Sequence, residues 1–301
     1  MKASKKLLAV ILALVVGAVV SGCGGGGGGG GGGSADSREL TLSIATGWDE
    51  SAVIANLSSI ILEEDLGYEE VRLQELELGP VIQGVASGDL DAYQDVWLPN
   101  HQAQIDEVEN DVVLLDPWYQ GTTEFGIAVP NYMTITTIPE LNDTGITQIL
   151  GIEPGAIISE RIPDSVIPTY NLNQEYVESS TPSMLSEVDS LYNNQEEFAF
   201  VAWRPHWMNA KYDFRYLEDP EDALQDLNDG ATILSIVNED LPDDDPVAYA
   251  FLDAIRLTEE QVNEIEAINP NDYAESARTW LEDNRDVVQP WIDAAREAEG
   301  S

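Results

Sequence analysis

Three tryptophans lie at the ends of predicted strands, where their rings could together bind a cation. Trp48 follows the first predicted strand, Trp97 ends a later one, and Trp203 follows another. Indole faces attract a quaternary ammonium group, which cannot donate ordinary hydrogen bonds, by up to about 2 kcal/mol per desolvated ring. Two or three rings around one crevice, with a second group to orient the ligand, predict affinity in the micromolar range. A single tryptophan more often packs in a core, which we expect for Trp118, Trp207, Trp280 and Trp291.

The chain carries few of the groups on which common enzymes depend. It has two histidines, His101 and His206, but no G-x-S-x-G motif, so nothing supports a catalytic triad. No H-E-x-x-H motif or Cys/His cluster predicts a zinc site. The 56 acidic residues offer many carboxylate pairs, so glycoside hydrolysis stays open as an alternative. We expect no catalytic residue, metal or cofactor, and a structural role for His206.

The charge balance is strongly acidic, with 13 Lys plus Arg against 56 Asp plus Glu and a formal net charge of −43. Nucleic acid and anionic lipid surfaces are excluded as main partners, because binding them requires positive charge. At physiological salt such a charge destabilises a compact state, whereas near 1 M the screening length falls to about 3 Å. The composition therefore predicts adaptation to high salt. The acidic run 240–245 matches no calcium loop and is interpreted as a solvated face.

The N-terminus has the pattern of a targeting segment. Three early lysines precede an apolar stretch at residues 7–20, which is too short for a spanning helix of about 20 residues. Residues 1–22 are therefore predicted to be a signal peptide. The sequence Val20-Ser21-Gly22-Cys23 resembles a bacterial lipobox, in which the cysteine becomes lipidated, and Cys23 is the only cysteine. Residues 23–38, which include ten consecutive glycines, are predicted to be the lipidated cysteine and a flexible tether. The alternative is ordinary signal cleavage with an incidental thiol.

From residue 39 onward, strand-like and helix-like segments alternate. Residues 40–44 alternate apolar and polar side chains, and residues 53–61 repeat apolar side chains at helical spacing. Later strands are predicted at 198–202 and 232–237, and a capping box at 258–261 begins a helix. This α/β pattern predicts two lobes, each a mainly parallel sheet flanked by helices, with a ligand in the cleft between them. We assign 39–129 and 232–301 to lobe 1, and 130–231 to lobe 2.

Several segments together resemble one known family. They are Gly-Trp-Asp-Glu at 47–50, 86–92, Trp-Leu-Pro-Asn-His at 97–101, 129–133, 151–157, 203–208, 211–212 and 216–220. In this order they resemble the glycine betaine/proline betaine-binding proteins of ABC importers, and the similarity extends from Leu40 to Trp291. The resemblance implies a two-lobe periplasmic-binding-protein fold of type II-like form, which closes around its ligand and has no catalytic activity.

The resemblance also implies a set of ligand-binding residues. Trp97 corresponds to a cage tryptophan found across the family, and His101 resembles the histidine that binds the betaine carboxylate. Trp48 matches the cage tryptophan of one branch, and Trp203 that of another. Which of these two completes the cage stays open.

A second group of implied binding residues follows the turn at 154–155. The backbone N–H groups of Ile157 and Ile158 resemble those that bind the carboxylate, as the first turn of a helix can. Ala156 lies where some relatives carry an aromatic residue. Tyr176 is the only aromatic side chain near another wall position of the family.

The predicted function follows from this resemblance. The protein would capture glycine betaine or proline betaine outside the cytoplasm, as a monomer attached to the membrane only through its lipid. It would deliver the ligand to the permease and ATPase subunits of an ABC importer for osmoprotection. The alternatives are a binding protein for choline, carnitine or ectoine, and a secreted salt-adapted carbohydrate-active enzyme.

Overall fold

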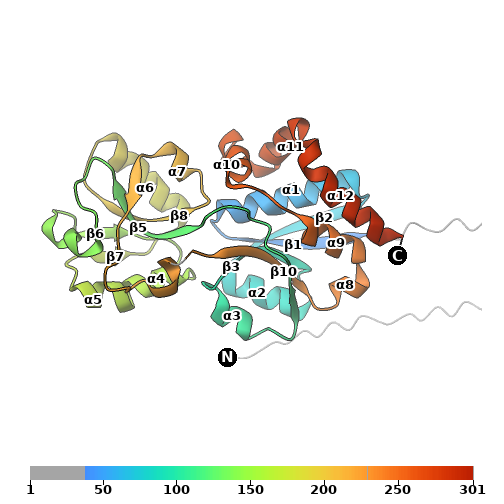
Figure 1. Ribbon diagram of the computed structural model, residues 1–301, viewed down its shortest axis with the longest axis horizontal. Helices are drawn as coiled ribbons and strands as arrows, with labels where there is room; N and C mark the ends of the chain where they lie inside the picture. Colours follow the sequence, from blue (N-terminus) through green and yellow to red (C-terminus); the bar gives the residue numbers. More distant parts are fainter. Residues whose placement is uncertain (1–37, 229, 301) are drawn as a thin grey trace, which may run out of the picture. The chain divides into compact units, whose positions relative to one another are not determined.

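The computed structural model describes residues 38–228 and 230–300, which contain two five-stranded sheets flanked by helices (Figure 1). The predictions for the signal peptide, Cys23 and the glycine tether concern residues outside this described part. None of the described helices is both long and apolar enough to cross a membrane.

The first sheet has the strand order β2-β1-β3-β10-β4. Strand β1 runs parallel to β2 and β3, whereas β10 runs antiparallel to β3 and β4. The strand bounds are β1 Glu39–Ala45, β2 Glu70–Leu76, β3 Ala92–Leu98, β4 Val112–Leu114 and β10 Thr232–Asn238.

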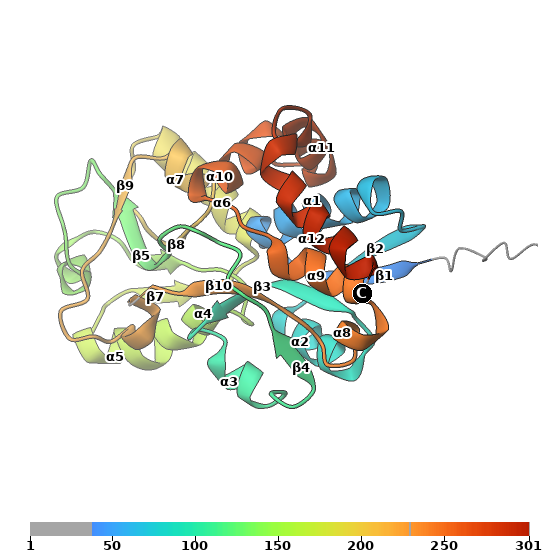
Figure 2. The same cartoon turned by 45° about the vertical axis from the view of Figure 1, so that its right-hand side comes forward.

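Helices cover both faces of this sheet. Figures 1 and 2 both place the C-terminal helices α10–α12 beside α1, on the face opposite α2. Helix α1 buries Val53, Ile54 and Leu57, the apolar residues that its spacing predicted. The helix bounds are α1 Asp49–Asp65, α2 Leu78–Ser87, α3 Gln102–Asp106, α8 Leu241–Asp244, α9 Pro246–Ala254, α10 Glu259–Ile268, α11 Tyr273–Asp283 and α12 Arg285–Glu299.

The second sheet repeats the plan of the first, with the order β7-β6-β8-β5-β9. Strand β6 is parallel to β7 and β8, and β5 is antiparallel to β8 and β9. Strands β6 and β8 therefore occupy the positions that β1 and β3 hold in the first sheet. The bounds are β5 Glu124–Pro130, β6 Gln148–Leu150, β7 Glu175–Val177, β8 Ala199–Arg204, β9 Phe214–Tyr216, α4 Ile157–Arg161, α5 Ile167–Tyr170, α6 Thr181–Asn193 and α7 Met208–Lys211, with a π-helical turn at Ile162–Val166 and 3₁₀ turns at Ile138–Asp143 and Gln225–Asn228.

Both sheets are mixed, and in each of them a single strand, β10 or β5, runs against the common direction of the other four, so the sheets are mainly parallel as predicted. The antiparallel strands β5 and β10 are those that follow the two passages of the chain from one sheet to the other. Two parallel strands of one sheet are joined by a crossover connection, which antiparallel neighbours do not need. A strand that the chain reaches from the other sheet, such as β5 or β10, can therefore lie antiparallel to its neighbours. Strand β5 begins at Glu124 and belongs to the second sheet. The lobe limits at 129 and 231 stay predictions.

Candidate ligand-binding site

Matching strand ends of the two sheets meet at one cavity. Trp48 follows β1 and Ile152 follows β6, while Trp97 is the second-last residue of β3 and Trp203 lies near the end of β8. The cavity is partly open to solvent and spans about 310 Å³ of space free of protein atoms, and it is lined by Trp48, Glu50, Trp97, Asn100, His101, Phe125, Ile152 and Trp203. The structure thus brings together the three tryptophans and the histidine that the sequence singled out.

Aromatic rings form most of the cavity wall. The Trp48 ring stacks on the imidazole of His101, with 5.7 Å between centroids and 19° between planes. Phe125 lies between the other two tryptophans, 6.3 Å from the Trp97 ring and 6.3 Å from the Trp203 ring. Trp97 and Trp203 are buried, with 5% and 3% of their surface exposed. These ring faces can surround an apolar cation.

His101 is held as a neutral imidazole with a defined tautomer. The backbone N–H of Trp97 donates a hydrogen bond of 3.1 Å to Nδ1 of His101. Burial lowers the pKa of His101 to about 3. Because Nδ1 accepts this hydrogen bond, the single proton of the neutral ring lies on Nε2, which is then a donor. A neutral donor of this kind can bind a carboxylate oxygen.

Trp97 is oriented by a buried acid on the same strand. Its indole N–H donates to Oδ1 of Asp95 at 2.7 Å. The two side chains share one face of β3 because they lie two residues apart. Asp95 is fully buried, and burial raises the pKa of its carboxyl to about 8, against a smaller lowering by the Trp97 hydrogen bond.

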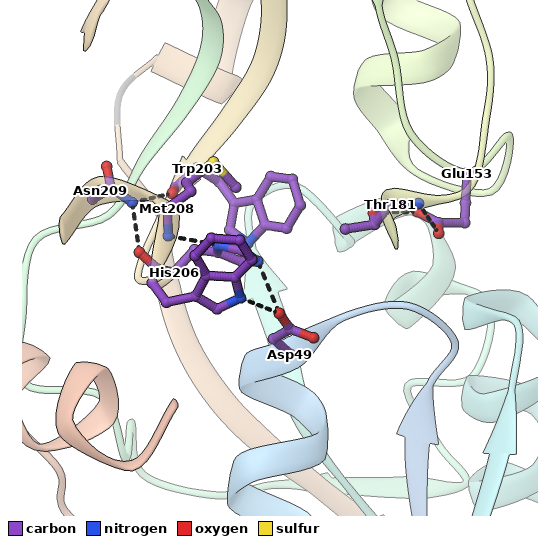
Figure 3. A network of polar contacts seen from close by, with 8 residues as sticks. Asp49, Glu153, Thr181, Trp203, His206, Met208 and Asn209 are labelled. Carbon is purple, nitrogen blue, oxygen red and sulfur yellow. Dashed lines mark hydrogen bonds and ion pairs between the residues drawn. The ribbon is translucent and has the colours of Figure 1, made fainter. Parts of the chain in front are cut away.

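Trp203 belongs to a polar network at the turn after β8 (Figure 3). The side-chain amide of Asn209 donates to the Trp203 carbonyl at 2.7 Å, and the His206 ring lies 4.7 Å from the Trp203 ring. Nδ1 of His206 accepts the backbone N–H of Met208 at 3.1 Å. Nε2 of His206 approaches Oδ2 of Asp49 to 3.2 Å. The buried His206 thus positions the turn and does not line the cavity.

Sequence reasoning missed four residues that line the cavity: Glu50, Asn100, Phe125 and Ile152. Glu50 and Asn100 lie inside quoted motifs, so their positions in 47–50 and 97–101 were a usable signal. Glu50 was not distinguishable from the many other acids. Phe125 begins an apolar strand, which is a pattern typical of core residues.

The predicted residues after the 154–155 turn are not among those that line the cavity. Ala156 and Ile158 are buried, and the N–H of Ala156 donates to the Glu153 carbonyl at 3.1 Å. The amides of Ile157 and Ile158 open helix α4, and their role in ligand binding stays a prediction. Tyr176 likewise does not line the cavity, since its hydroxyl contacts Ser159 at 2.8 Å and accepts the Ile152 N–H.

The remaining tryptophans lie outside the cavity lining. Trp118, Trp280 and Trp291 are buried in the hydrophobic core, as predicted. Trp207 is only partly buried, and it packs against that core with its indole N–H on Asp49. In the described part of the chain, no group of three or more His, Cys, Asp or Glu side chains is arranged to hold a metal ion.

Known proteins resemble this chain in sequence and architecture. Residues 39–283 match the family described as the substrate-binding domain of ABC-type glycine betaine transport systems. The glycine betaine/carnitine transport binding protein GbuC of Listeria monocytogenes serotype 1/2a (strain 10403S) is 31% identical over 157 residues. That match covers 50% of this chain and 51% of GbuC, so the chain spans about half the length of this curated relative.

Solved structures agree over a larger region. Lactococcal OpuAC, in a closed-liganded conformation complexed with glycine betaine, has a TM-score of 0.77 and 27% identity, over 85% of this chain and 99% of that chain. The glycine betaine/L-proline-binding protein ProX of Borrelia burgdorferi has a TM-score of 0.77 at 22% identity, over 87% of this chain and 100% of its own. At that lower identity, the second match shows the fold alone.

Proposed function

Because the chain belongs to the family of substrate-binding domains of ABC-type glycine betaine transport systems, we propose that it captures glycine betaine or a related quaternary-ammonium solute. The family consists of transport proteins and not of enzymes. Substrate-binding proteins of ABC importers act outside the cytoplasm, in the periplasm or at the cell exterior. The solved relative OpuAC binds glycine betaine in its closed form, which supports the same ligand here.

The observation that carries this proposal is the cavity lined by Trp48, Trp97 and Trp203 together with His101. A trimethylammonium group has no N–H donor and is attracted to indole faces. The ligand carboxylate then accepts the Nε2–H of His101, which the Trp97 amide leaves free on the far side of the ring. One end of the ligand is thus recognised by rings and the other by a hydrogen-bond donor.

Ligand capture proceeds by closure of the two sheets and their helices around the cavity. Trp48, Trp97 and His101 come from the first sheet and its loops, while Phe125, Ile152 and Trp203 come from the second. A ligand that contacts both groups stabilises the closed form relative to the open one. The amides of Ile157 and Ile158 add donors to the carboxylate in this proposal.

The remaining steps of transport also belong to this proposal. The closed protein delivers its ligand to the permease and ATPase subunits of an importer, and it works as a monomer. Cys23 carries a lipid that attaches the protein to the outer face of the membrane. Uptake of a compatible solute agrees with the acidic composition, which we interpret as adaptation to high salt.

Calorimetric titration in molar salt tests the ligand assignment. We expect glycine betaine or proline betaine to bind with micromolar affinity, and Trp97→Ala to weaken binding at least tenfold. Trp280→Phe, in the core and away from the cavity, is the matched control and should retain affinity. Choline lacks the carboxylate and should bind more weakly than glycine betaine. Titrations with carnitine and ectoine test the other alternative ligands. Failure of every one of these solutes to bind, or turnover of a glycan by the purified protein, would overturn the proposal.

A further inference from the structure

Three carboxyl groups are buried beside the cavity without a cationic partner. Glu50 in the first turn of α1, Asp95 in β3 and Glu266 in α10 are each at most 2% exposed. Oε2 of Glu50, Oδ2 of Asp95 and both carboxyl oxygens of Glu266 make no hydrogen bond. Among residues 38–228 and 230–300, no lysine, arginine or histidine is paired with any of the three. We call these residues the buried acid cluster.

Among the described residues, no lysine or arginine faces the cluster from the surrounding elements. Asp49 of α1, Tyr93 of β3 and Tyr273 of α11 act electrostatically on its members. His206, after β8, lies against Asp49, and His101 faces the same cavity as Glu50 in its neutral form. Bound protons, or a cation that enters the cavity, can supply the charge that no lysine or arginine provides.

Three ionised carboxylates cannot share a dry site without compensation, because each loses solvation and repels the others. Burial raises the pKa of Glu50 well above its usual range, and Asp95 and Glu266 raise it further. Burial likewise raises the pKa of Glu266, Asp49 and Asp95 add to the effect, and the backbone N–H of Trp207 opposes it by a smaller amount than burial. Burial of three carboxyl groups without a lysine or arginine partner thus favours bound protons over ionised carboxylates in the empty cavity.

Glu50 connects this cluster to the ligand, because it is the member that lines the cavity. It follows Trp48 by two residues and lies in the same wall. A quaternary ammonium group held by the rings places a fixed positive charge next to Glu50. That charge favours the ionised carboxylate, as an arginine or lysine would.

We propose, on the basis of the function proposed above, that ligand capture is coupled to proton release: the quaternary ammonium group replaces a proton of the buried acid cluster, chiefly that on Glu50, and the proton passes to solvent. No bond of the ligand changes. The exchange selects solutes with a fixed positive charge over neutral molecules of the same shape, since only a cation stabilises the ionised cluster.

Asp95 transmits the same change to the cage. Its Oδ1 accepts the indole N–H of Trp97, and a hydrogen bond to a charged acceptor is stronger than one to a neutral acid. Ionisation within the cluster thus tightens the orientation of Trp97 as the ligand enters. By linkage, affinity rises with pH, by up to about tenfold per pH unit for one proton, over the range where the empty cavity holds the proton and the liganded cavity does not, and it levels off once the empty cavity has lost the proton.

Proton release can be measured directly by calorimetry. The wild-type protein is titrated with glycine betaine in molar salt at one pH near neutrality, in buffers of different ionisation enthalpy. The slope of the observed enthalpy against buffer enthalpy counts the protons exchanged, and we expect release of up to about one proton per ligand. Betaine binding with zero slope at each pH from 5 to 8 would overturn this inference and leave the proposed function intact. Absence of binding would instead count against the proposed function itself.

Two comparisons assign the proton to the cluster. Glu50→Gln should bind betaine with at least half of the proton release lost, whereas Asp91→Asn, a half-buried acid at the opposite end of β3, should release as many protons as wild type. Unchanged proton release in Glu50→Gln would contradict the assignment.

If that variant does not fold, 3,3-dimethylbutanoate tests the proposal in the wild type, because it has the shape and carboxylate of glycine betaine without the positive charge. It should bind at least tenfold more weakly and release no proton, and release equal to that with betaine would contradict the proposal.

Discussion

Asp49 accepts the indole N–H of Trp207 through Oδ2 at a distance of 2.6 Å. Asp49 is the residue after Trp48 at the start of α1, and Trp207 follows Trp203 by four residues in the turn after β8. This hydrogen bond therefore joins the wall of the cavity that the first sheet supplies to the wall that the second sheet supplies. Neither residue lines the cavity, so the contact lies beside it.

The Asp49–Trp207 contact should contribute to ligand affinity by stabilising the closed form. A hydrogen bond to a carboxylate contributes about 1.5–3 kcal/mol, so we expect Asp49→Ala and Trp207→Phe each to weaken betaine binding by roughly ten- to a hundredfold. The double variant should bind no more weakly than the poorer single variant, and calorimetry on all four proteins measures this coupling. Asp293→Ala, on the exposed side of α12, is the control. Fully additive losses would contradict a direct contact.

His101 should make stability depend on pH in a defined direction. Its pKa is about 3 in the folded protein and about 6.5 in an unfolded chain, so below pH 6.5 the unfolded state binds more protons. The contribution of the neutral imidazole is complete above pH 6.5 and is lost as the pH falls toward 3. Relative to His101→Gln, the wild type should lose up to about 1.4 kcal/mol of unfolding free energy per pH unit in this window.

Denaturant unfolding of both proteins at pH 7, 6, 5 and 4 in constant molar salt measures this difference. The carboxylates are common to both proteins, so their contributions cancel in the comparison. Two parallel curves of unfolding free energy against pH would contradict the prediction, because they would show that protonation of His101 does not destabilise the folded protein.

The fold was predictable where the sequence pattern is long. The apolar spacing of residues 53–61 predicted α1, and the capping box at 258–261 predicted the start of α10 at Glu259, where Thr258 and Gln261 do form it. The strands β4, β7 and β9 have three residues each, which is too short for an alternating pattern to appear. The direction of β5 and β10 depends on partners far away in the chain, which no local pattern records.

The site was predictable only in part, for a similar reason. Trp48, Trp97 and Trp203 were predicted from their places at strand ends, and these ends do meet at one cavity. Glu50 could not be chosen among 56 acids by its type alone. What distinguishes it is burial beside Asp95 and Glu266, and this is a property of the tertiary structure.

Gly47 should be required for closure, because no side chain fits at its position. Its φ is +82°, and a Cβ there would collide with Oε1 of Glu153. Hydrogen bonds from the N–H and hydroxyl of Thr181, at 2.6 and 2.7 Å, hold that carboxylate in place (Figure 3). We expect Gly47→Ala to weaken betaine binding at least tenfold and to lower stability by about 1 kcal/mol.

Gly67→Ala separates the two effects. Gly67 also has a positive φ, +78°, but nothing lies within 4 Å of a Cβ built there. The Gly67→Ala variant should therefore lose as much stability in thermal unfolding as Gly47→Ala, while calorimetry should show unchanged affinity for betaine. Normal betaine affinity in Gly47→Ala would contradict a close approach of this loop to Glu153 in the ligand-bound form.

The net charge of −43 should make the folded protein more stable as salt rises. Self-repulsion acts over about 8 Å at 0.15 M salt and about 3 Å at 1 M, so screening favours the compact state. Exposed ion pairs such as Arg285–Asp65, at 2.6 Å, weaken in salt, but each contributes at most about 1 kcal/mol. Thermal unfolding at pH 7.5 in 0.15, 0.5, 1 and 2 M NaCl should therefore give midpoint temperatures that rise with salt.

The same salt series near the isoelectric point of about 4.1 is the control. Little net charge is left to screen at that pH, so the midpoint temperatures should change much less. Midpoints that fall with salt at pH 7.5 would show that the ion pairs outweigh the self-repulsion and would contradict the interpretation of salt adaptation.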